Sequence, residues 1–384
     1  MGSLVDRKIG YGIVQPGQNI LHGVPVIKVN NLIAGLHSKG ELDVTTKEND
    51  EKYSRTRLEG GELIVSVVGT VGKTAIVPKS FRGCNLVRAV AMIDIKENWP
   101  SRWVKYYIDS PAGQAYIEQN LNTTVQATLN IKTLVDMPIP FLKEDEMRKI
   151  VTILEAIDKK IECNQQINDN LLEQMQALYK SWFVDYRPFG GVMPTSWTQT
   201  GIYSLANIIY GAPFASKQFN TEGNGKPIIR IRDLKDQQFA TYTTEVHPKG
   251  YLLHPGDIVV GMDGEFRPYI WGNDEAWLNQ RVCVFENKRP NGKAFLYFTI
   301  KPLLFAIEQT QVATTVIHIG KKDFDAFEIM LPDTELLDAF DVITTPMVEQ
   351  IVSNSIENKR LAIMRDVLLP KLMSGEIDVS AIRL

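Results

Sequence analysis

Hydrophobic positions between residues 147 and 182 recur in alternating steps of three and four along the chain. This spacing is typical of a heptad seam, so it predicts one long α-helix over residues 143–186 that packs against a partner helix. At 1.5 Å per residue, such a helix would be roughly 65 Å long. The seam residues are Met147, Ile150, Leu154, Ile157, Ile161, Asn164, Asn168, Leu171, Met175, Leu178 and Trp182.

A second seam lies near the end of the chain and repeats the first at a shift of 190 residues. Its members are Met347, Ile351, Asn354, Asn358, Leu361, Leu368 and Leu372, with the charged Arg365 as the odd member. We expect the two helices to pair antiparallel as a coiled coil, with the asparagines of both seams facing one another and selecting the register. In the alternative interpretation, these amides are solvated at a point where the helices splay apart.

The repeat also runs through the segments that precede each predicted helix. Val24–Leu32 matches Lys226–Leu234, and Gly61–Val65 matches Gly256–Val260. Each copy begins with short β-branched runs, continues with an aromatic-rich helix and a Thr-rich turn, and ends in a strand marked by proline. The sequence therefore predicts a mixed α/β fold of the α+β class. Two similar globular domains would be separated by two long antiparallel coiled-coil helices, with a pseudo-twofold internal repeat.

Domain boundaries follow from this pattern. We place the first globular domain at residues 1–142, the central helix at 143–186, the second globular domain at 187–333 and the C-terminal helix with its tail at 334–384. The net charge of the chain is −3, but residues 143–186 carry −3 and residues 333–378 carry −5, which leaves +5 on the remainder. This modest surplus permits a phosphate-facing surface on the globular domains.

Several classes of protein are disfavoured by composition. The N-terminal residues hold no apolar run typical of a signal peptide, and the most apolar stretch, 295–307, is too short to span a bilayer. The three cysteines, Cys84, Cys163 and Cys283, lie far apart and lack zinc-ligand spacing. We expect a cytoplasmic protein without structural disulfides, metal, other cofactors or a membrane partner.

One motif is similar to a phosphate-binding loop. In Gly69–Thr74 the Walker pattern would need glycine at position 67, where the chain has Val67, and the matching segment Gly261–Arg267 lacks the Gly-Lys-Ser/Thr end. We favour a glycine turn that presents Lys73 or Arg267 to a DNA phosphate over an ATP site, with a plain turn as the alternative. The histidines show no spacing for nucleophilic catalysis or metal binding, so no catalytic residue is predicted.

Two copies of a globular domain tied to a stiff helical pair favour a ligand with two half-sites. Half-sites that face the same way on B-DNA lie about 34–36 Å apart, a spacing that helices of this length can hold. Because the copies have diverged, the two half-sites would differ, and the expected target is asymmetric.

The chain resembles the specificity subunit of a type I restriction–modification system over nearly its whole length. The segments that carry the resemblance are Ala156–Glu162, Ala177–Asp185, Leu368–Ile377, Gly23–Val29 and Gly256–Val260. The resemblance implies two target-recognition domains, each reading one half of a bipartite site in double-stranded DNA. It also implies helices that set the spacer and dock two modification subunits, which are adenine methyltransferases, and through them the restriction and translocase subunits. The chain itself has no Pro-Pro and so lacks the methyltransferase motif.

One departure from the family pattern concerns the start of the first domain. The second half has a lead-in, Met193–Leu205, ahead of Tyr210, whereas the first half starts almost directly at Tyr11. The edge of the first recognition domain is therefore less well defined than that of the second.

DNA-binding candidates are polar residues at recurring positions of the repeat, because such side chains read base edges or hold phosphates. They are Lys28, Asn30, Asn31, Lys73, Arg88, Thr124 and Gln126 in the first domain, and Arg230, Arg232, Arg267, Tyr269, Arg281, Thr314 and Thr315 in the second. Each could instead be a solvated surface residue or part of a structural ion pair.

The alternative function is a coiled-coil protein-interaction adaptor without sequence-specific DNA binding.

Overall fold

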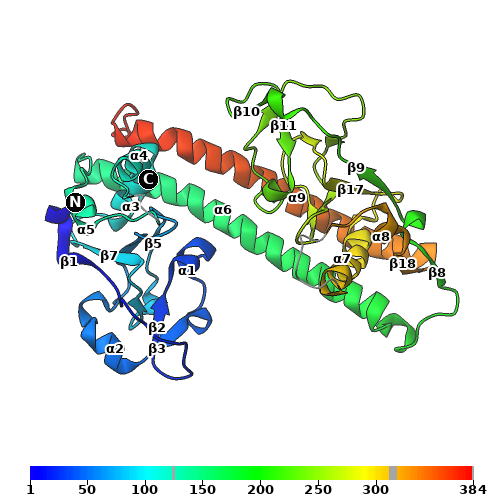
Figure 1. Cartoon of the computed structure of the whole chain (residues 1–384), viewed down its shortest axis with the longest axis horizontal. Coiled ribbons are helices and arrows are strands. Elements are labelled where there is room, and N and C mark those ends of the chain that lie inside the picture. Colours follow the sequence, from blue (N-terminus) through cyan, green and yellow to red (C-terminus); the bar gives the residue numbers. More distant parts are fainter. Residues whose placement is uncertain (123–125, 311–317, 383–384) are drawn as a thin grey trace. The chain divides into compact units, whose positions relative to one another are not determined.

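The computed structural model describes residues 1–122, 126–310 and 318–382 of the chain (Figure 1). The chain forms two compact units, one of Met1–Asp158 with Ala362–Leu384 and the other of Lys159–Leu361. Two long helices, α6 (Glu144–Tyr179) and α9 (Thr334–Met373), contribute residues to both units. The predicted mixed fold, with two similar units and long helices, is confirmed.

The first unit contains two small sheets. Strands β1 (Val5–Tyr11), β7 (Val90–Ile95), β4 (Leu63–Ser66) and β5 (Thr74–Ile76) form one sheet in this order, and every pair is antiparallel. Strands β3 (Asp43–Thr45), β2 (Val24–Ile27) and β6 (Asn85–Leu86) form the other, with β2 parallel to β6. All residues of β4 are buried, which explains its continuous apolar run.

Short helices cover these sheets. They are α1 (Val29–Ala34), α2 (Lys47–Lys52), α3 (Ser101–Asp109), α4 (Pro111–Gln119) and α5 (Ile131–Asp136). Helix α4 begins where the Ser110 hydroxyl accepts a hydrogen bond from Gly113 N and Pro111 occupies the first turn. The aromatic-rich helix expected from the sequence is α3, whose Trp103 is fully buried.

The second unit repeats this topology. Strands β9 (Ala206–Tyr210), β17 (Val282–Asn287), β14 (Ile258–Gly261) and β15 (Pro268–Ile270) form an antiparallel sheet in the order of β1, β7, β4 and β5. The second sheet has the order β10 (Phe219–Asn220), β12 (Tyr242–Thr243), β11 (Lys226–Ile229), β16 (Ala276–Leu278) and β13 (Leu252–Leu253). Its β11–β16 pair is parallel, as is the β2–β6 pair.

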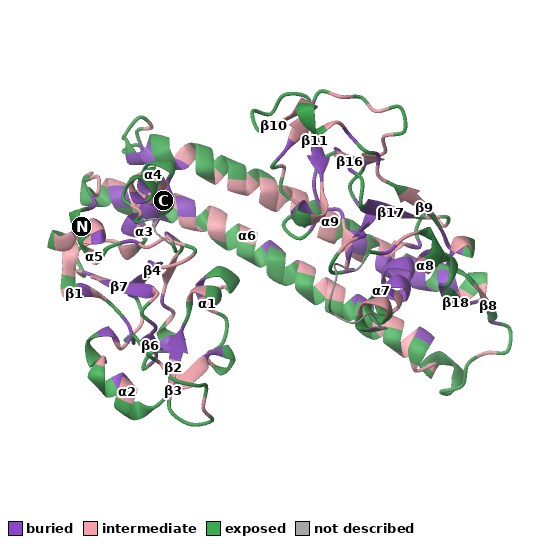
Figure 2. Ribbon diagram, in the orientation of Figure 1, coloured by how far each residue is buried: buried purple, intermediate pink, exposed green. Residues whose placement is uncertain are grey.

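Helices α7 (Lys293–Thr310) and α8 (Lys321–Asp325) complete the second unit, and its largest core packs around α7 (Figure 2). The lead-in noted in the sequence forms β8 (Thr198–Gly201), which pairs antiparallel with β18 (Glu328–Leu331). At the corresponding place in the first unit, the Met1 ammonium donates a hydrogen bond to Met137 O at 2.7 Å.

The same backbone crossing links the two sheets in each unit. Ile13 N donates to Leu86 O at 2.7 Å, and Ala212 N donates to Leu278 O at 3.1 Å. The preceding glycines, Gly12 and Gly211, allow this approach, because a Cβ on them would lie 1.9 Å from Leu86 O or 2.0 Å from Asn279 O.

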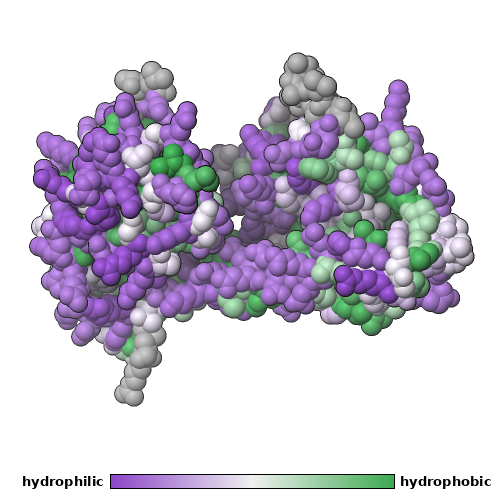
Figure 3. All heavy atoms as spheres, turned by 90° about the horizontal axis from the view of Figure 1, so that it is seen from below, coloured by the Kyte–Doolittle hydropathy of each residue, from purple (hydrophilic) through white to green (hydrophobic). Residues whose placement is uncertain are grey.

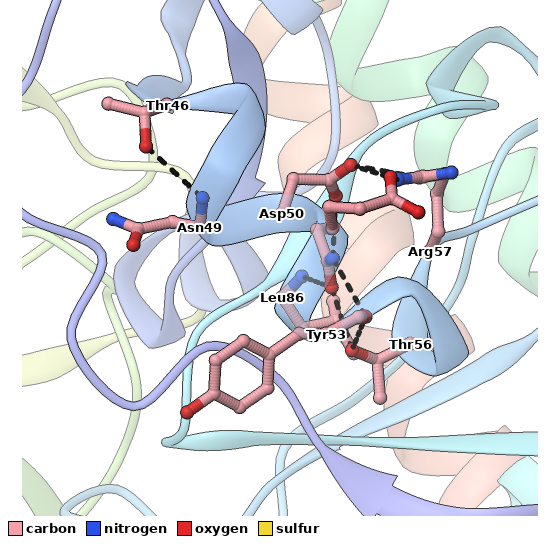
Figure 4. Close-up of polar contacts among 9 residues, drawn as sticks. Thr46, Asn49, Asp50, Tyr53, Thr56, Arg57 and Leu86 are labelled. Carbon is pink, nitrogen blue, oxygen red and sulfur yellow. Dashed lines mark hydrogen bonds and ion pairs between the residues drawn. The ribbon is translucent and has the colours of Figure 1, made fainter.

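A buried polar network fixes α2 against β6 in the first unit (Figure 4). Asn85 is fully buried and donates to Asp50 Oδ1 at 2.7 Å, while its own Oδ1 accepts from the Thr56 hydroxyl at 2.8 Å. Asp50 also pairs with Arg57, and the hydrogen bonds to Asp50 and Glu51 raise the pKa of Arg57. Every buried group of this network therefore has a partner, as burial of polar atoms requires.

The asparagines form a symmetric network between α6 and α9 in the second unit. Asn164 Nδ2 donates to Asn358 Oδ1 at 2.9 Å, and Asn358 Nδ2 donates to Ile161 O at 3.2 Å. The same pattern recurs after the 190-residue shift, because Asn354 Nδ2 donates to Asn168 Oδ1 at 2.8 Å and Asn168 Nδ2 donates to Ile351 O at 3.3 Å. The residue numbers rise in opposite directions, so the helices are antiparallel here.

The two halves of this network differ in one detail. Asn354 Oδ1 accepts a hydrogen bond from Gln350, one turn earlier, whereas Asn164 Oδ1 accepts none from the described residues. At the matching position, Lys160 instead pairs with Glu357 at 3.1 Å. Hydrogen bonds from Asn164 and Lys160 lower the pKa of Glu357.

An ion pair joins the same helices in the first unit. Arg365 Nη1 lies 2.9 Å from Asp158 Oδ1, and the hydroxyl of the buried Tyr106 donates to Asp158 Oδ2 at 2.6 Å. Burial and the hydrogen bond to Asp158 raise the pKa of Tyr106 above its ordinary value. Ile150, Leu154 and Leu372 of the seams lie in the adjoining apolar cluster.

Each predicted seam residue is buried or half-buried in its unit, and exposed residues separate them along α6 (Figure 2). These residues are Ile150, Leu154, Ile157, Ile161, Asn164, Asn168, Leu171, Met175, Leu178, Met347, Ile351, Asn354, Asn358, Leu361, Leu368 and Leu372. The α-helical part of α6 is shorter than expected, because a π-helical turn follows over Lys180–Val184, where Asp185 N donates to Lys180 O. This turn brings the buried Phe183 into the core of the second unit.

We predict that Gly12→Ala destabilises the protein by about 1–3 kcal/mol, because the added methyl group overlaps a backbone carbonyl that cannot move freely. Gly211→Ala should behave alike. Gly201→Ala is the control, since its added methyl group would meet its nearest neighbour at an ordinary 4.0 Å, and it should change stability by less than about 0.5 kcal/mol. Urea unfolding followed by fluorescence measures all of them. Equal midpoints for Gly12→Ala and Gly201→Ala would contradict the prediction.

We also predict that Asn354→Leu costs about 1–3 kcal/mol of stability, because Asn168 Oδ1 loses its donor in a buried seam. The double variant Asn168→Leu/Asn354→Leu removes both polar partners and should recover most of that loss. The free energy of unfolding of the wild type, both single variants and the double variant forms a double-mutant cycle. Strictly additive effects would show that the amides do not interact.

Candidate DNA interface

Three loops converge at one edge of the antiparallel sheet in the first unit. Val67 N, after β4, donates to Ala89 O at 2.8 Å, and Leu129 N donates to Val67 O at 2.8 Å. Gly69 N donates to Ala127 O at 2.9 Å. The glycine turn, the β6–β7 loop and the segment after the Thr-rich stretch are therefore joined by backbone hydrogen bonds.

The second unit builds the same edge from the matching residues. Met262 N donates to Arg281 O at 2.8 Å, and Ile319 N donates to Met262 O at 2.9 Å. Asp263 and His318 form an isolated antiparallel bridge, as do Val68 and Thr128 in the first unit. We call this arrangement in either unit the three-loop edge.

The side chains at the three-loop edge differ between the units. In the first unit Arg88 and Gln126 are exposed, and a methyl group on Gly69 would lie 3.2 Å from Gln126 Nε2. The amide of Gln126 therefore lies over the glycine turn. Arginine and glutamine are side chains that make bidentate contacts with guanine and adenine in the major groove.

In the second unit the edge carries both signs of charge. Asp263 Oδ1 lies 2.5 Å from His318 Nδ1 and 3.9 Å from Arg281 Nη1. More than half of the Arg281 and His318 side chains is exposed, at 57% and 54%. Arg281 has a left-handed backbone with φ 68°, which is uncommon for a residue with a Cβ. Asp263 and His318 were not among the sequence candidates, although matching the repeat to Val68 and Thr128 would have placed them here.

Some sequence candidates are engaged in structural contacts away from this edge. The Asn31 side chain accepts from Lys28 N at 2.8 Å and so caps α1, and Lys28 pairs with Asp43. Arg230 pairs with Asp233 at 3.3 Å and also donates to Thr241.

Arg267 and Tyr269 lie close together in the second unit, Arg267 directly before β15 and Tyr269 within it. Arg267 pairs with Glu308, and its guanidinium lies over the Phe305 ring; the hydrogen bond to Glu308 raises the pKa of Arg267. Tyr269 is half-buried in β15, and burial raises its pKa. Asn30 and Arg232 are exposed. Thr124, Thr314 and Thr315 lie outside the described residues. All of these DNA contacts remain predictions.

The glycine turn of the first unit does not have the geometry of a phosphate loop. Gly72 N donates to Ser66 O at 2.9 Å and Lys73 N donates to Ser66 Oγ at 2.8 Å, so these amides are already occupied. Lys73 lines a cavity of about 410 Å³ that also holds the carboxylates of Asp109, Asp158 and Asp366. The cavity is also lined by Lys105 and Arg365, so its side chains carry three charges of each sign and no surplus of positive charge for a nucleotide.

Among the described residues, no group of histidine, cysteine and acidic side chains could hold a metal ion. The face in Figure 3 is largely hydrophilic. No helix in the described part of the chain combines the length and the apolar character that a membrane crossing needs.

Comparison with known proteins identifies the family. The type I restriction modification DNA specificity domain matches residues 18–173 and again residues 194–353. The chain is 38% identical over 138 residues to the type I restriction enzyme EcoBI specificity subunit of Escherichia coli, a match that covers 36% of this chain and 29% of that subunit. It is 24% identical to the MjaIX specificity subunit of Methanocaldococcus jannaschii, over 89% of this chain and 83% of that subunit.

A solved structure has the same fold. The S subunit of a type I restriction-modification system from M. genitalium superposes with a TM-score of 0.56 at 15% identity, and the match covers 97% of this chain and 94% of that one. Both copies of the family domain fall on the repeat described above, one in each half of the chain. The chain therefore belongs to the type I restriction–modification DNA specificity family, whose members are the non-catalytic, DNA-recognising subunits of these systems.

Proposed function

We propose that each unit reads one half of an asymmetric bipartite site in double-stranded DNA through its three-loop edge. The observation that carries this proposal is the recurrence of the edge on the same backbone scaffold with different side chains. Arg88 and Gln126 lie on the three-loop edge of the first unit, and Arg281, His318 and Asp263 lie on that of the second unit. Since base edges differ in their donors and acceptors, these sets favour different half-sites.

We infer that the helical pair serves two further purposes. It would set the spacer between the half-sites, and it would dock modification subunits, two adenine methyltransferases, with restriction and translocase subunits bound through them. Family membership supports DNA and methyltransferase subunits as partners. The domain boundaries that accompany this proposal remain 1–142, 143–186, 187–333 and 334–384.

A coiled-coil adaptor that binds only proteins is the alternative function. It requires no sequence preference in DNA and no contribution of the three-loop edges to binding. Exchange of one globular domain for that of another family member separates the two functions, because the half-site should change only if the domain reads DNA.

We predict that Arg281→Ala weakens binding to the cognate DNA by about 1–3 kcal/mol and relaxes the preference in one half-site. Arg88→Ala should do the same in the other half-site. The cognate sequence is obtained by mapping methylated adenines in the host genome, and affinity is measured by fluorescence anisotropy with the modification subunit present.

Lys288→Ala and Lys96→Ala are the matched controls. Lys288 follows β17 and Lys96 follows β7, so each lies at the end of its strand opposite to Arg281 or Arg88, and its replacement removes the same charge. Losses of equal size for the arginine and lysine variants would assign the effect to net charge and reject the three-loop edge.

We predict that insertion of seven residues into each long helix, in heptad register, lengthens the preferred spacer by up to about three base pairs. The inserted turns add about 10 Å of helix at 1.5 Å per residue, and base pairs rise about 3.4 Å each. Methylation mapping in cells that carry the variant reports the spacer. An unchanged spacer in an active variant would show that the helices do not set it.

A further inference from the structure

The asparagine network cannot by itself choose between helices. Each amide contact joins one Asn of the Asn164/Asn354 position to one of the Asn168/Asn358 position. Both positions occur on α6 and both occur on α9, at a shift of 190 residues. A pair of α6 helices from two chains, or a pair of α9 helices, would satisfy the same hydrogen bonds and keep the same register.

The ion pair between Asp158 and Arg365 in the first unit distinguishes α6 from α9. Asp158 corresponds to Val348 at the 190-residue shift, and Arg365 corresponds to Met175. Tyr106, which donates to Asp158, corresponds to Phe298 in the matched aromatic helices. Val348, Met175 and Phe298 are all buried in the main core of the second unit.

We propose that Asp158 and Arg365 specify which helix pairs with which, so that α6 accepts α9 and rejects a second copy of α6 from another chain. The proposal goes beyond DNA recognition and does not rest on it. It concerns the choice between pairing within one chain and pairing with a second copy.

Pairing of like helices breaks the ion pair between Asp158 and Arg365. Asp158 then keeps only the hydroxyl of Tyr106, and Arg365 keeps only the neighbouring Asp366, whose side chain is 63% exposed. In an α6–α6 pair with the same register, Asp158 would face Met175 of the other copy. In an α9–α9 pair, Arg365 would face Val348. Both side chains are 31% exposed in the native pair, and a charge that faces an apolar residue in place of its partner on the other helix is unfavourable there. The alternative partners are therefore disfavoured without any change in the apolar seam.

The ion pair between Lys160 and Glu357, which also joins these helices, contributes less to this choice. Lys160 and Glu357 are 50% and 44% exposed, so water screens their interaction. Asp158, in contrast, has both carboxylate oxygens engaged, one by Arg365 and one by Tyr106.

Two charge-reversed full-length chains with different affinity tags test the proposal. Arg365→Asp places two acids together, and Asp158→Arg places two bases together. The folding equilibrium constant of each single variant should therefore be about tenfold smaller than that of the wild type. When the two are refolded together, Asp158 of the Arg365→Asp chain can pair with Arg365 of the Asp158→Arg chain. The two introduced side chains have opposite charges and can pair in the same complex. The mixture should yield a 1:1 complex in pull-down and light scattering.

The double variant Asp158→Arg/Arg365→Asp is the control, because its reversed pair lies within one chain. It should be monomeric and recover the stability of the wild type. The proposal is overturned if the mixture stays monomeric, or if the double variant is as unstable as the single ones.

A triple variant, compared with the wild type, distinguishes a role in selecting the partner helix from a role in stabilising the fold. Tyr106→Phe/Asp158→Val/Arg365→Met copies the apolar set of the second unit into the first. Its unfolding midpoint should equal or exceed that of the wild type, because well-packed apolar residues commonly replace a buried ion pair without loss. A large loss of stability would show that the ion pair serves stability and would count against a role in selection.

Discussion

Amides buried in an apolar helical seam must hydrogen-bond to one another or to the backbone, and this constraint fixes how α6 and α9 pair in the second unit. Asn164 meets Asn358, and Asn168 meets Asn354, with backbone carbonyls completing the set. A slip of the register would leave these groups unpaired at a cost of about 1–3 kcal/mol each. The helices therefore have one favourable register, and the packing of the unit's core on them depends on it.

The two units have the same backbone arrangement but present different side chains on it. The hydrogen bonds that close the three-loop edge involve main-chain atoms, so the scaffold tolerates exchange of the side chains that it presents. Gly12 and Gly211 serve the scaffold in the same way, by allowing two strands to approach where no side chain fits. This separation between backbone closure and side-chain identity is consistent with two readers that have one fold and different preferences.

Periodicity was sufficient to predict the helices, their seams and the internal repeat, because heptad spacing is a local signal. The contacts of individual polar residues were not predictable in this way. Arg267 matched a repeated position, yet it pairs with Glu308 from a different element, and Asp50 meets Asn85 across 35 residues. Asp263 and His318 carried no motif and come together through a bridge between two loops. Such pairings depend on tertiary structure, which composition and spacing do not encode one residue at a time.

The left-handed backbone at Arg281 has a consequence for how the second unit can diversify. Glycine, asparagine and aspartate adopt this conformation most readily, whereas β-branched side chains are strained in it. Ala89, the matching residue of the first unit, is not among the residues with positive φ. A β-branched substitution at position 281 should therefore strain the backbone, whereas the backbone of Ala89 imposes no such restriction.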